Sequence, residues 1–421
     1  MKNKQKHVSP QLDKSKCTGC AACYSACPKG CIRMQEDNEG FLYPIVNENE
    51  CIDCGLCQRI CPTHITKAPR PPKQILAIKN KQTEVRMRSS SGAVFSLLAE
   101  YVLKKGGVVF GAAFDEKWEV VHTYIERREE LDGLRRSKYA QSRIGDTYTK
   151  VKKFLGDGRL VLFTGSPCQI AGLSSFLQKK HENLLMMDFV CHSVPSPKVW
   201  RKYLAELYTQ ITTTNGDKNF LSNIKDINFR DKTSGWKDYS FCLSLRTPRS
   251  EQTTTLRIPY YKNLYMNFFL SDTISRPSCS MCNQKQGRSG ADITVGDYWW
   301  INAVHPKLDD DKGCSVVYIF TEKGCDAIRA IKDDAEILQT DTKAEIKNAY
   351  LFTGAYAECA TPNKTRKKLF NELDEKTLQQ LQPLSIRVKS PKERIFEQIK
   401  AVLSKLHLFN SAKSIYILLK K

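Results

Sequence analysis

A repeated cysteine pattern constrains this chain more than any other feature of its sequence. Nine of its 17 cysteines fall between Cys17 and Pro62, where the pattern CxxCxxCxxxCP occurs twice. The first run contains Cys17, Cys20, Cys23 and Cys27, and the second contains Cys51, Cys54, Cys57 and Cys61. Thiolates separated by two residues can turn three sulfur atoms toward one inorganic centre, while the proline turn carries the fourth past it. The repeat therefore predicts a small unit that folds around two centres.

The repeat resembles bacterial-type ferredoxins with two [4Fe-4S] clusters, in which the fourth cysteine of each run ligates the cluster of the other run. The resemblance assigns the first cluster to Cys17, Cys20, Cys23 and Cys61. It assigns the second cluster to Cys51, Cys54, Cys57 and Cys27. Cys31 lies just outside the repeat, and we interpret it as a small core residue.

Zinc and disulfides are the competing interpretations of these cysteines. A structural zinc site takes four ligands as paired CxxC or Cys/His knuckles, so the third cysteine of each run is surplus to it. Disulfides need an oxidising compartment, but no apolar segment follows Lys2, Lys4 and Lys6 as it would in a secretory signal. Both alternatives are weaker than two iron–sulfur clusters.

Length and charge bound the remainder of the chain. Its 421 residues suffice for two or three domains with a full-sized core. No apolar run reaches the roughly 18 residues of a transmembrane helix, so we expect a cytoplasmic protein, in which thiols stay available for metal. The net charge of +21 invites a nucleic-acid interpretation. However, the tail after Thr361 is strongly basic and no known nucleic-acid-binding pattern occurs, so we expect no nucleic-acid partner.

Changes in composition divide the chain into five segments. They are a basic lead-in at residues 1–16, a two-cluster ferredoxin domain at 17–68, a proline-rich linker at 69–74, a mixed α/β domain at 75–360 and a basic helical tail at 361–421. The ferredoxin domain, of α+β class, should contain a hairpin of strands at Ile32–Met34 and Phe41–Val46. In the tail, apolar residues from Ile395 to Leu406 recur at helical spacing among basic residues. We expect this helix to pack on its own domain, with contact to the anionic inner face of the membrane or to the acidic face of a partner as the alternative.

A run of serines and a glycine at residues 89–92 lies between a strand expected at Ile75–Ile78 and a helix expected at Ala93–Lys104. Such a helix start can supply an ordinary cap or leave backbone N–H groups free to bind a phosphate, and from the residues alone the cap is favoured. A polar stretch further on, without an evident structural duty, contains Lys138, Tyr139 and Gln141.

A strand, a crossover helix and a second strand form the next unit. The pattern predicts strands at Leu160–Phe163 and Leu184–Val190 with a helix at Gln169–Gln178, which makes a parallel right-handed unit. Cys168 and Cys191 each follow the carboxyl end of a strand, so they lie on one rim of the sheet. Open α/β sheets hold ligands at this rim, and two cysteines there are less easily dismissed as core filling.

An isolated CxxC follows at Cys279 and Cys282, and no second CxxC or pair of histidines near it completes a zinc site. Arg276 and Arg288 flank it and could offset the charge of a thiolate-bound cluster. We interpret the remaining cysteines as structural: Cys242, Cys314, Cys325 and Cys359.

From about Ile75 to about Phe320 the chain resembles the beta-subunit family of deazaflavin coenzyme hydrogenases and dehydrogenases. The resemblance rests on the order and spacing of five short stretches: Ser90-Ser91-Gly92, Ser137-Lys138-Tyr139-Ala140-Gln141-Ser142, Phe163-Thr164-Gly165-Ser166-Pro167-Cys168-Gln169, Cys191-His192-Ser193-Val194-Pro195-Ser196-Pro197, and Cys279 to Trp299. Three positions at which the family often has glycine differ here, namely Ala93, Ser193 and Trp300.

Members of that family bind FAD and one [4Fe-4S] cluster in this domain, and some carry the same ferredoxin in front. The resemblance thus implies a mixed α/β flavin- and cluster-binding domain. Its implied third [4Fe-4S] cluster takes Cys168, Cys191, Cys279 and Cys282. Its implied FAD contacts are Ser90, Ser91 and Gly92 at the phosphates, Lys138, Tyr139 and Gln141 beside them, and Gly165 and Pro167 at the ring.

These parts together predict an electron-transfer function. Iron–sulfur clusters move one electron at a time, whereas a hydride acceptor takes two, so a flavin between them is the necessary converter. We expect an iron–sulfur flavoprotein oxidoreductase that passes electrons between ferredoxin-type clusters, FAD and an acceptor, which is a redox partner protein or a small molecule. The alternative is an electron-transfer subunit without its own substrate that docks on a catalytic partner. A nucleic-acid-binding iron–sulfur protein comes third.

Overall fold

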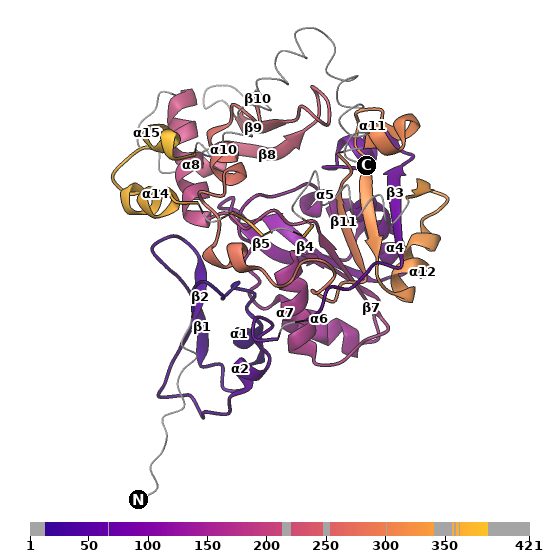
Figure 1. Ribbon diagram of the computed structural model, residues 1–421, viewed down its shortest axis with the longest axis horizontal. Helices are drawn as coiled ribbons and strands as arrows, with labels where there is room; N and C mark the ends of the chain where they lie inside the picture. The colour runs from indigo at the N-terminus through magenta and orange to yellow at the C-terminus, as the bar shows by residue number, and fades with distance from the viewer. Residues whose placement is uncertain are drawn as a thin grey trace, which may run out of the picture.

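The computed structural model describes residues 13–65, 67–212, 220–246, 253–299, 301–340, 356–357, 359–361 and 363–385. Within these ranges the chain forms three sheets, of two, three and eight strands. Figure 1 shows the smallest sheet and its helices, in indigo, beside a larger body that contains the other two sheets. No helix in the described ranges is long and apolar enough to cross a membrane.

The two cysteine runs fold into a small ferredoxin-like unit with internal symmetry. Its elements are α1 (Ala22–Ala26), β1 (Ile32–Glu36), β2 (Leu42–Val46) and α2 (Leu56–Arg59). Strands β1 and β2 pair antiparallel, which confirms the expected hairpin. Each run leads into a short helix, and the residue before it, Ala21 or Gly55, has a φ of 60° or 66°. The repeated spacing in the sequence therefore produces a repeated backbone turn.

The largest sheet, which we call the central sheet, has its strands in the order β13-β3-β12-β11-β7-β6-β4-β5. They are β3 (Gln74–Asn80), β4 (Val108–Phe114), β5 (Val120–Ile125), β6 (Val161–Gly165), β7 (Leu184–Phe189), β11 (Ile293–Asp297), β12 (Ser315–Ile319) and β13 (Ala335–Gln339). The four central strands, from β11 to β4, run parallel, and the outer strands pair antiparallel. The sheet is mixed, as the alternation of strands and helices predicts.

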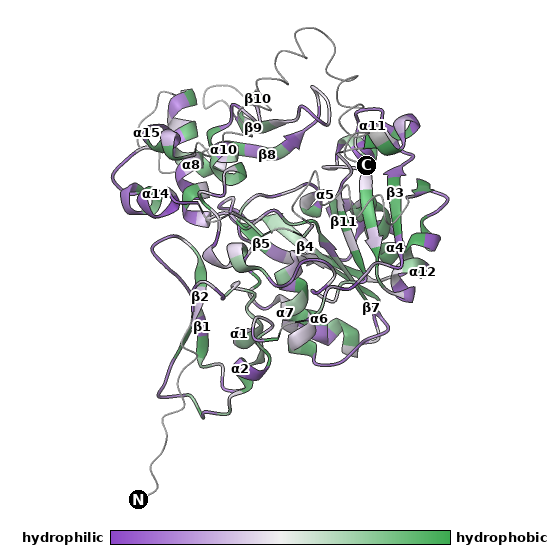
Figure 2. Cartoon of the chain, viewed as in Figure 1, coloured by the Kyte–Doolittle hydropathy of each residue, from purple (hydrophilic) through white to green (hydrophobic). Residues whose placement is uncertain are grey.

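Helices cover both faces of this sheet. Four of them are α4 (Val94–Lys104), α6 (Thr147–Gly156), α7 (Pro167–Leu177) and α12 (Glu322–Ala330). Successive residues of a strand point to opposite faces, so Val109 of β4 packs with α4 and α12 while Phe110 packs with α6 and α7. Figure 2 accordingly shows the strands of this sheet as largely hydrophobic.

The parallel pair β6 and β7, with α7 as its crossover, confirms the unit expected from the sequence. Helix α7 begins at Pro167, two residues earlier than its pattern predicts. The reason is a capping box, in which the side chains of Ser166 and Gln169 satisfy the first N–H groups of the helix.

A second sheet and its helices form an aromatic subdomain. Its elements are α8 (Pro197–Thr212), α9 (Phe220–Asn223), β8 (Ile224–Asp231), β9 (Ser240–Arg246), β10 (Thr253–Pro259), α10 (Leu264–Leu270), α14 (Arg366–Glu372) and α15 (Leu378–Leu381). Trp200, Phe229 and Tyr265 meet in its core, and Leu369 and Leu373 pack against them with no exposed surface. The first part of the region expected as a basic tail is thus core material. The apolar repeat from Ile395 onward lies outside the described residues.

The remaining helices are single turns: α3 (Thr83–Met87), η1 (Arg128–Glu130), α5 (Leu131–Leu134), η2 (Pro277–Met281), α11 (Ile301–Val304), η3 (Pro306–Leu308) and η4 (Gln382–Ser385). The proline-rich linker runs along the edge of the central sheet. The N–H of Arg70 donates to the carbonyl of Gln286, and that of Lys73 donates to the carbonyl of Ile319. The Arg70 guanidinium also lies 4.6 Å from the centre of the Phe320 ring. These contacts fix the linker to the larger body.

Candidate functional site

Four thiols gather where the small unit meets the larger body, and we call them the inner group. The inner group consists of Cys17, Cys20, Cys23 and Cys61. Burial first, and then the Cys17 and Cys61 thiolates, raise the pKa of Cys23 to about 12. The fourth cysteine of the second run therefore lies with the first three of the first run. This is the set of thiols that the sequence assigns to the first cluster.

The inner group packs against helix α7. Cys20 is 8% exposed. A Cβ atom added to Gly172 of α7 would lie 2.9 Å from the Cβ of Cys20 and 3.1 Å from its Sγ. Glycine at position 172 therefore lets the helix approach the thiols closely.

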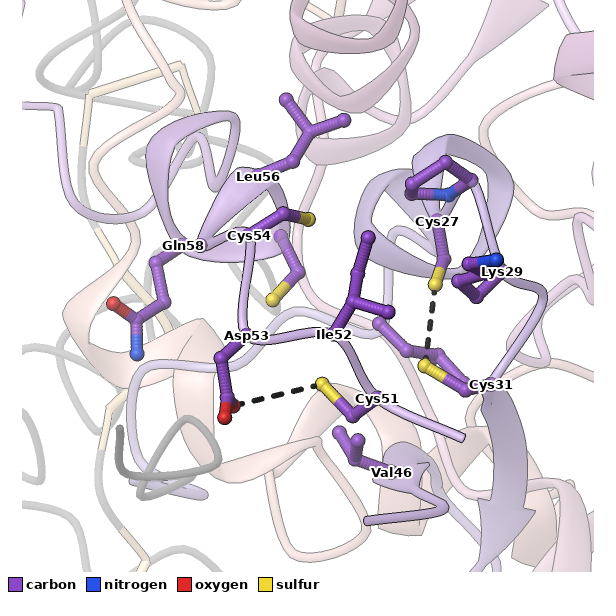
Figure 3. Close-up of a pocket in the computed structure, with 14 residues that line it drawn as sticks. Cys27, Lys29, Cys31, Val46, Cys51, Ile52, Asp53, Cys54, Leu56 and Gln58 are labelled. Atoms are coloured by element: carbon purple, nitrogen blue, oxygen red, sulfur yellow. Dashed lines mark hydrogen bonds between the residues drawn. The ribbon is translucent and has the colours of Figure 1, made fainter. Parts of the chain in front are cut away.

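Four further thiols form the outer group, which consists of Cys27, Cys51, Cys54 and Cys57. They line a cavity of about 60 Å³ (Figure 3), and Cys54 is exposed. Burial acts to raise the pKa of Cys27, but hydrogen bonds from the Cys31 thiol and from backbone N–H groups at residues 29–31 lower it. Such donors favour the thiolate, which is the form that binds iron. This is the set that the sequence assigns to the second cluster.

Cys31 also lines the cavity of the outer group. It is 5% exposed, so its interpretation as a core residue agrees with its burial. Its Sγ, however, lies 3.4 Å from the Sγ of Cys27, in hydrogen-bond contact. The outer cavity thus contains five thiols, one more than a cluster needs.

The inner and outer groups each consist of four thiols, which is the donor set of a four-iron cube. A cube binds each thiolate at a separate iron, whereas a zinc ion gathers its sulfur ligands at about 2.3 Å from a single point. Among the residues that the structure describes, no group of three Cys, His, Asp or Glu side chains forms a site for a single metal ion.

A third group of thiols comes together at the rim of the central sheet. Cys168 lies in the first turn of α7, Cys191 follows β7, and Cys279 and Cys282 lie in and just after η2. Burial raises the pKa of Cys191 well above its usual range, and the three other thiols of the group act in the same direction. The structure therefore brings together the four cysteines that the family resemblance implies for a third cluster. Cys359, interpreted as structural, also lies here and donates to the carbonyl of Cys282 at 3.3 Å.

Arg276 lies between the inner and third groups and is 1% exposed. Its guanidinium donates to the carbonyl of Cys17 and to Oε1 of Gln141, both at 2.8 Å, and lies 3.8 Å from the Sγ of Cys17. Its charge also acts to lower the pKa values of Cys168 and Cys279. Arg276 therefore offsets negative charge on two thiol groups.

Arg288, the second cation expected beside the third group, points elsewhere. The chain turns through Gly287, at φ 72°, and the Arg288 side chain then donates to the carbonyls of Lys67 and Lys285. Lys285 takes the expected role, because its charge acts to lower the pKa of the buried Cys191.

A cavity of about 500 Å³ opens beside the third group. Six of the eight residues implied as FAD contacts line it, namely Ser90, Ser91, Lys138, Tyr139, Gln141 and Gly165. Cys168 and Cys191 line it as well. The third group and the cavity therefore share a wall.

Gly92 and Pro167, the other two residues implied as FAD contacts, do not line this cavity. The N–H of Gly92 donates to Oγ of Ser315, and a Cβ atom at this position would lie 2.2 Å from the carbonyl oxygen of Ile78. Gly92 thus serves a close approach of two strands. Pro167 is the buried first residue of α7, where its fixed φ suits a helix start.

The start of α4 faces the cavity without a cap, so the favoured interpretation of the serine run as an ordinary cap is wrong. The residue at the cap position is Ala93, with a φ of 67°, and no side chain caps the helix. The hydroxyl of Ser91 donates instead to the carbonyl of Cys314. Val94 and Phe95, the first residues of the helix, line the cavity. They lie at the N-terminal end of the helix, where the helix dipole is positive and favours an anion such as phosphate.

Basic groups also line the cavity, and carboxylates already pair with two of them, Asp132 with Arg135 and Asp226 with Arg136. Arg135, Arg136 and Lys138 line the same cavity. Burial first, and then the charge of Arg136, lower the pKa of Lys138 to about 7. Its Nζ donates to the carbonyl of Arg135 at 2.8 Å. A bound phosphate would favour the protonated form of this lysine.

Sequence reasoning missed His122, which lies in the wall of the cavity. Burial lowers its pKa to about 4, so the ring is neutral near pH 7. Nε2 lies 2.9 Å from the carbonyl of Thr164 and must donate to it, so Nδ1 accepts from the hydroxyl of Ser142. A single histidine within an apolar strand gave no signal of this position.

Sequence reasoning also missed the contribution of the aromatic subdomain. Arg230 of β8 pairs with Asp297 at 3.0 Å, and its guanidinium lies 4.0 Å from the centre of the Tyr239 ring and 4.9 Å from that of Trp299. All four residues line the cavity. The stretch that contains β8 carries no motif, so only the tertiary fold reveals this wall.

Two protein families match the chain. Residues 16–65 match the family described as "4Fe-4S dicluster domain". Residues 158–345 match the family described as the C terminus of the coenzyme F420 hydrogenase/dehydrogenase beta subunit. No curated protein matches the chain.

Among solved structures, one chain of the F420-reducing [NiFe] hydrogenase complex from Methanosarcina barkeri is similar to this chain. The identity is 15% and the TM-score is 0.42, over 75% of this chain and 94% of the other. The two family matches cover the thiols of the inner and outer groups and all four thiols of the third group. The chain therefore contains a 4Fe-4S dicluster domain at residues 16–65 and, at residues 158–345, a domain of the family described as the C terminus of the coenzyme F420 hydrogenase/dehydrogenase beta subunit.

Proposed function

We propose that this chain is an iron–sulfur flavoprotein oxidoreductase that passes electrons between three [4Fe-4S] clusters, FAD and an acceptor. The observation that carries the proposal is the order of the sites. The outer group, the inner group, the third group and the large cavity form one series, linked by helix α1, by helix α7 and by the wall that contains Cys168. Each member of this series shares an element or a wall with the next.

Helix α7 supports the step between the inner and third groups. Gly172 of this helix meets Cys20, and Cys168 lies four residues before it. Four residues correspond to about 6 Å along a helix. Arg276 adds a second connection, because it contacts Cys17 while its charge acts on Cys168 and Cys279.

The cavity beside the third group suits FAD. The uncapped start of α4 and Lys138 would hold its phosphates, with Ser90 and Ser91 beside them. Gly165 would let the flavin ring approach the rim of the sheet near Cys168. FAD supplies the conversion between one-electron and two-electron transfer, which clusters lack. The neutral His122 and the paired Arg230 also line this cavity and would orient the ring and the acceptor.

A second candidate function is that of an electron-transfer subunit that docks on a catalytic partner. The family description, which names a beta subunit, favours it. So does the surface beside the exposed Cys54, where Ile52 lines the same cavity and is 57% exposed. An apolar surface beside a cluster is suited to a redox partner protein.

Composition and turnover test the proposal together. Anaerobically purified protein should contain about twelve irons and one FAD per chain. The reduced protein should then transfer electrons to at least one small acceptor in a screen of the isolated chain. Iron without flavin would contradict the proposal. Flavin and iron without turnover of any small acceptor would favour the docking subunit instead.

A further inference from the structure

Cys31 is a fifth thiol in the outer group, and the repeat shows that it is specific to one run. Cys31 follows Cys27 by four residues. The same place after Cys61, the fourth cysteine of the second run, holds Ile65. Ile65 is 44% exposed, whereas Cys31 is 5% exposed. The two halves of the repeat therefore differ at this position, which holds a buried thiol in one half and an exposed isoleucine in the other.

The geometry places Cys31 where an iron ligand belongs. Figure 3 draws its sulfur between those of Cys27 and Cys51, on the wall of the cavity that the outer group lines. The distance from its Sγ to the Sγ of Cys27 is 3.4 Å. Cys31 thus faces the same centre as the ligands of the outer group.

The backbone holds both thiols in this arrangement. Cys31 directly precedes strand β1, and its carbonyl accepts from the N–H of Asn47 after β2, at 2.7 Å. Cys27 lies at the end of α1, and its carbonyl accepts from the N–H of Gly30 at 3.2 Å. The tight turn between them keeps the two sulfur atoms in contact.

We propose that Cys31 is an alternative ligand for the outer cluster and can replace Cys27 at its iron, an inference that rests on the cluster assignment of the proposed function. In the exchange, the bond from iron to the Cys27 sulfur breaks and a bond from iron to the Cys31 sulfur forms. The proton of the Cys31 thiol passes across the 3.4 Å contact to the Cys27 sulfur. Charge and electron count are unchanged, so the exchange needs no oxidant or reductant.

The location of the spare thiol agrees with this role. The outer group includes the exposed Cys54 and borders an open cavity, so solvent and oxidants reach its cluster first. The inner group packs under α7 and Arg276, and Ile65 stands where its spare thiol would be. The spare thiol therefore lies at the more exposed of the two groups.

Iron retention in the full chain tests the inference, with Cys27→Ala, Cys27→Ala/Cys31→Ala and Cys61→Ala as variants. Each is purified anaerobically, and iron per chain and the electron paramagnetic resonance (EPR) spectrum after dithionite reduction are measured. Cys27→Ala should keep the iron content of the unmodified chain. The double variant should lose about four irons. Cys61→Ala, the matched control without a spare thiol, should also lose about four.

Loss of about four irons from Cys27→Ala, whether that variant is folded or unfolded, would overturn the inference. Full iron in the double variant would overturn it equally, because a ligand other than Cys31 would then hold the cluster. Failure of the proposed function is distinguishable from both results, since it would appear as missing cluster iron in the unmodified chain.

Discussion

Cys20 of the inner group is 8% exposed beneath α7, whereas Cys54, which has the same place in the second run, lies in solvent. The two runs have identical spacing, so local sequence alone gives them the same ligand geometry. Their surroundings come from tertiary contacts. Gly172 and Arg276 contact the inner group, and Cys31 contacts Cys27 of the outer group. One motif therefore supplies both a buried and an exposed group of thiols.

A cation lies beside the inner group, so we expect the two clusters to differ in redox potential. A cluster becomes more negative when it is reduced, so a nearby guanidinium stabilises the reduced state. Arg276 lies 3.8 Å from the Sγ of Cys17. We therefore expect the inner cluster to have the higher potential, which favours electron flow from the outer cluster inward.

The largest expected difference concerns loss of one ligand from each group. Cys20→Ser and Cys54→Ser should each remove about four irons. Because Cys20 is packed against α7, its loss should also loosen the larger body and lower the melting temperature by roughly 5 °C. All five tryptophans lie after the linker, so their fluorescence reports that body alone. Equal decreases in the melting temperature of the two variants would contradict the distinction between a buried and an exposed cluster.

The next effect is steric. In Gly172→Ala the added Cβ meets Cys20 and the hydroxyl of Tyr148, at 2.8 Å, and should cost about 1–3 kcal/mol in the free energy of unfolding. Gly156→Ala, on the neighbouring helix α6, meets nothing within 4 Å and should stabilise by up to about 1 kcal/mol. Urea denaturation of both variants measures these two changes in the free energy of unfolding. A harmless Gly172→Ala would mean that α7 does not press on the inner group.

A smaller effect is expected in redox potential. Arg276→Gln removes the charge beside Cys17 but keeps a hydrogen-bonding side chain. The inner cluster should then become harder to reduce, by about 60 mV, a tenfold change for a one-electron couple. The outer cluster should not shift. A redox titration followed by EPR separates the two signals, and equal shifts would show that Arg276 does not distinguish the clusters.

The sequence predicts most of the ligand geometry because that information is local. The spacing CxxCxxCxxxCP places three sulfurs together, and the strand–helix–strand pattern puts Cys168 and Cys191 on one rim. The features that the sequence does not predict depend on contacts between residues far apart in the chain. Arg276 contacts Cys17 although 259 residues separate them, and Arg230 lines the cavity although it belongs to a separate sheet. The sequence also fails to predict the uncapped start of α4, because serines before a helix usually cap it. Here the hydroxyl of Ser91 donates to the carbonyl of Cys314 instead.

The smallest effect lies at the far end of the proposed path. The pKa of Lys138 is lowered to about 7, so its charge is present below pH 7 and is lost above it. Affinity for FAD should therefore fall severalfold, by less than about tenfold, as pH rises from 6 to 8. Lys138→Gln should bind more weakly and show no such dependence. Titration of the flavin-free protein with FAD measures both, and a flat profile in the unmodified chain would exclude Lys138 from phosphate binding.

The most direct test of the electron path is reduction of the flavin in Cys168→Ser, with Cys325→Ser as a control outside the three groups. Photoreduced ferredoxin is mixed rapidly with each protein, and the flavin absorbance and the cluster EPR signals are followed. We predict that Cys168→Ser lacks about four irons and keeps its flavin oxidised while the inner and outer clusters become reduced. The control should behave as the unmodified chain. Flavin reduction at an unchanged rate, or a full iron complement in Cys168→Ser, would contradict the path.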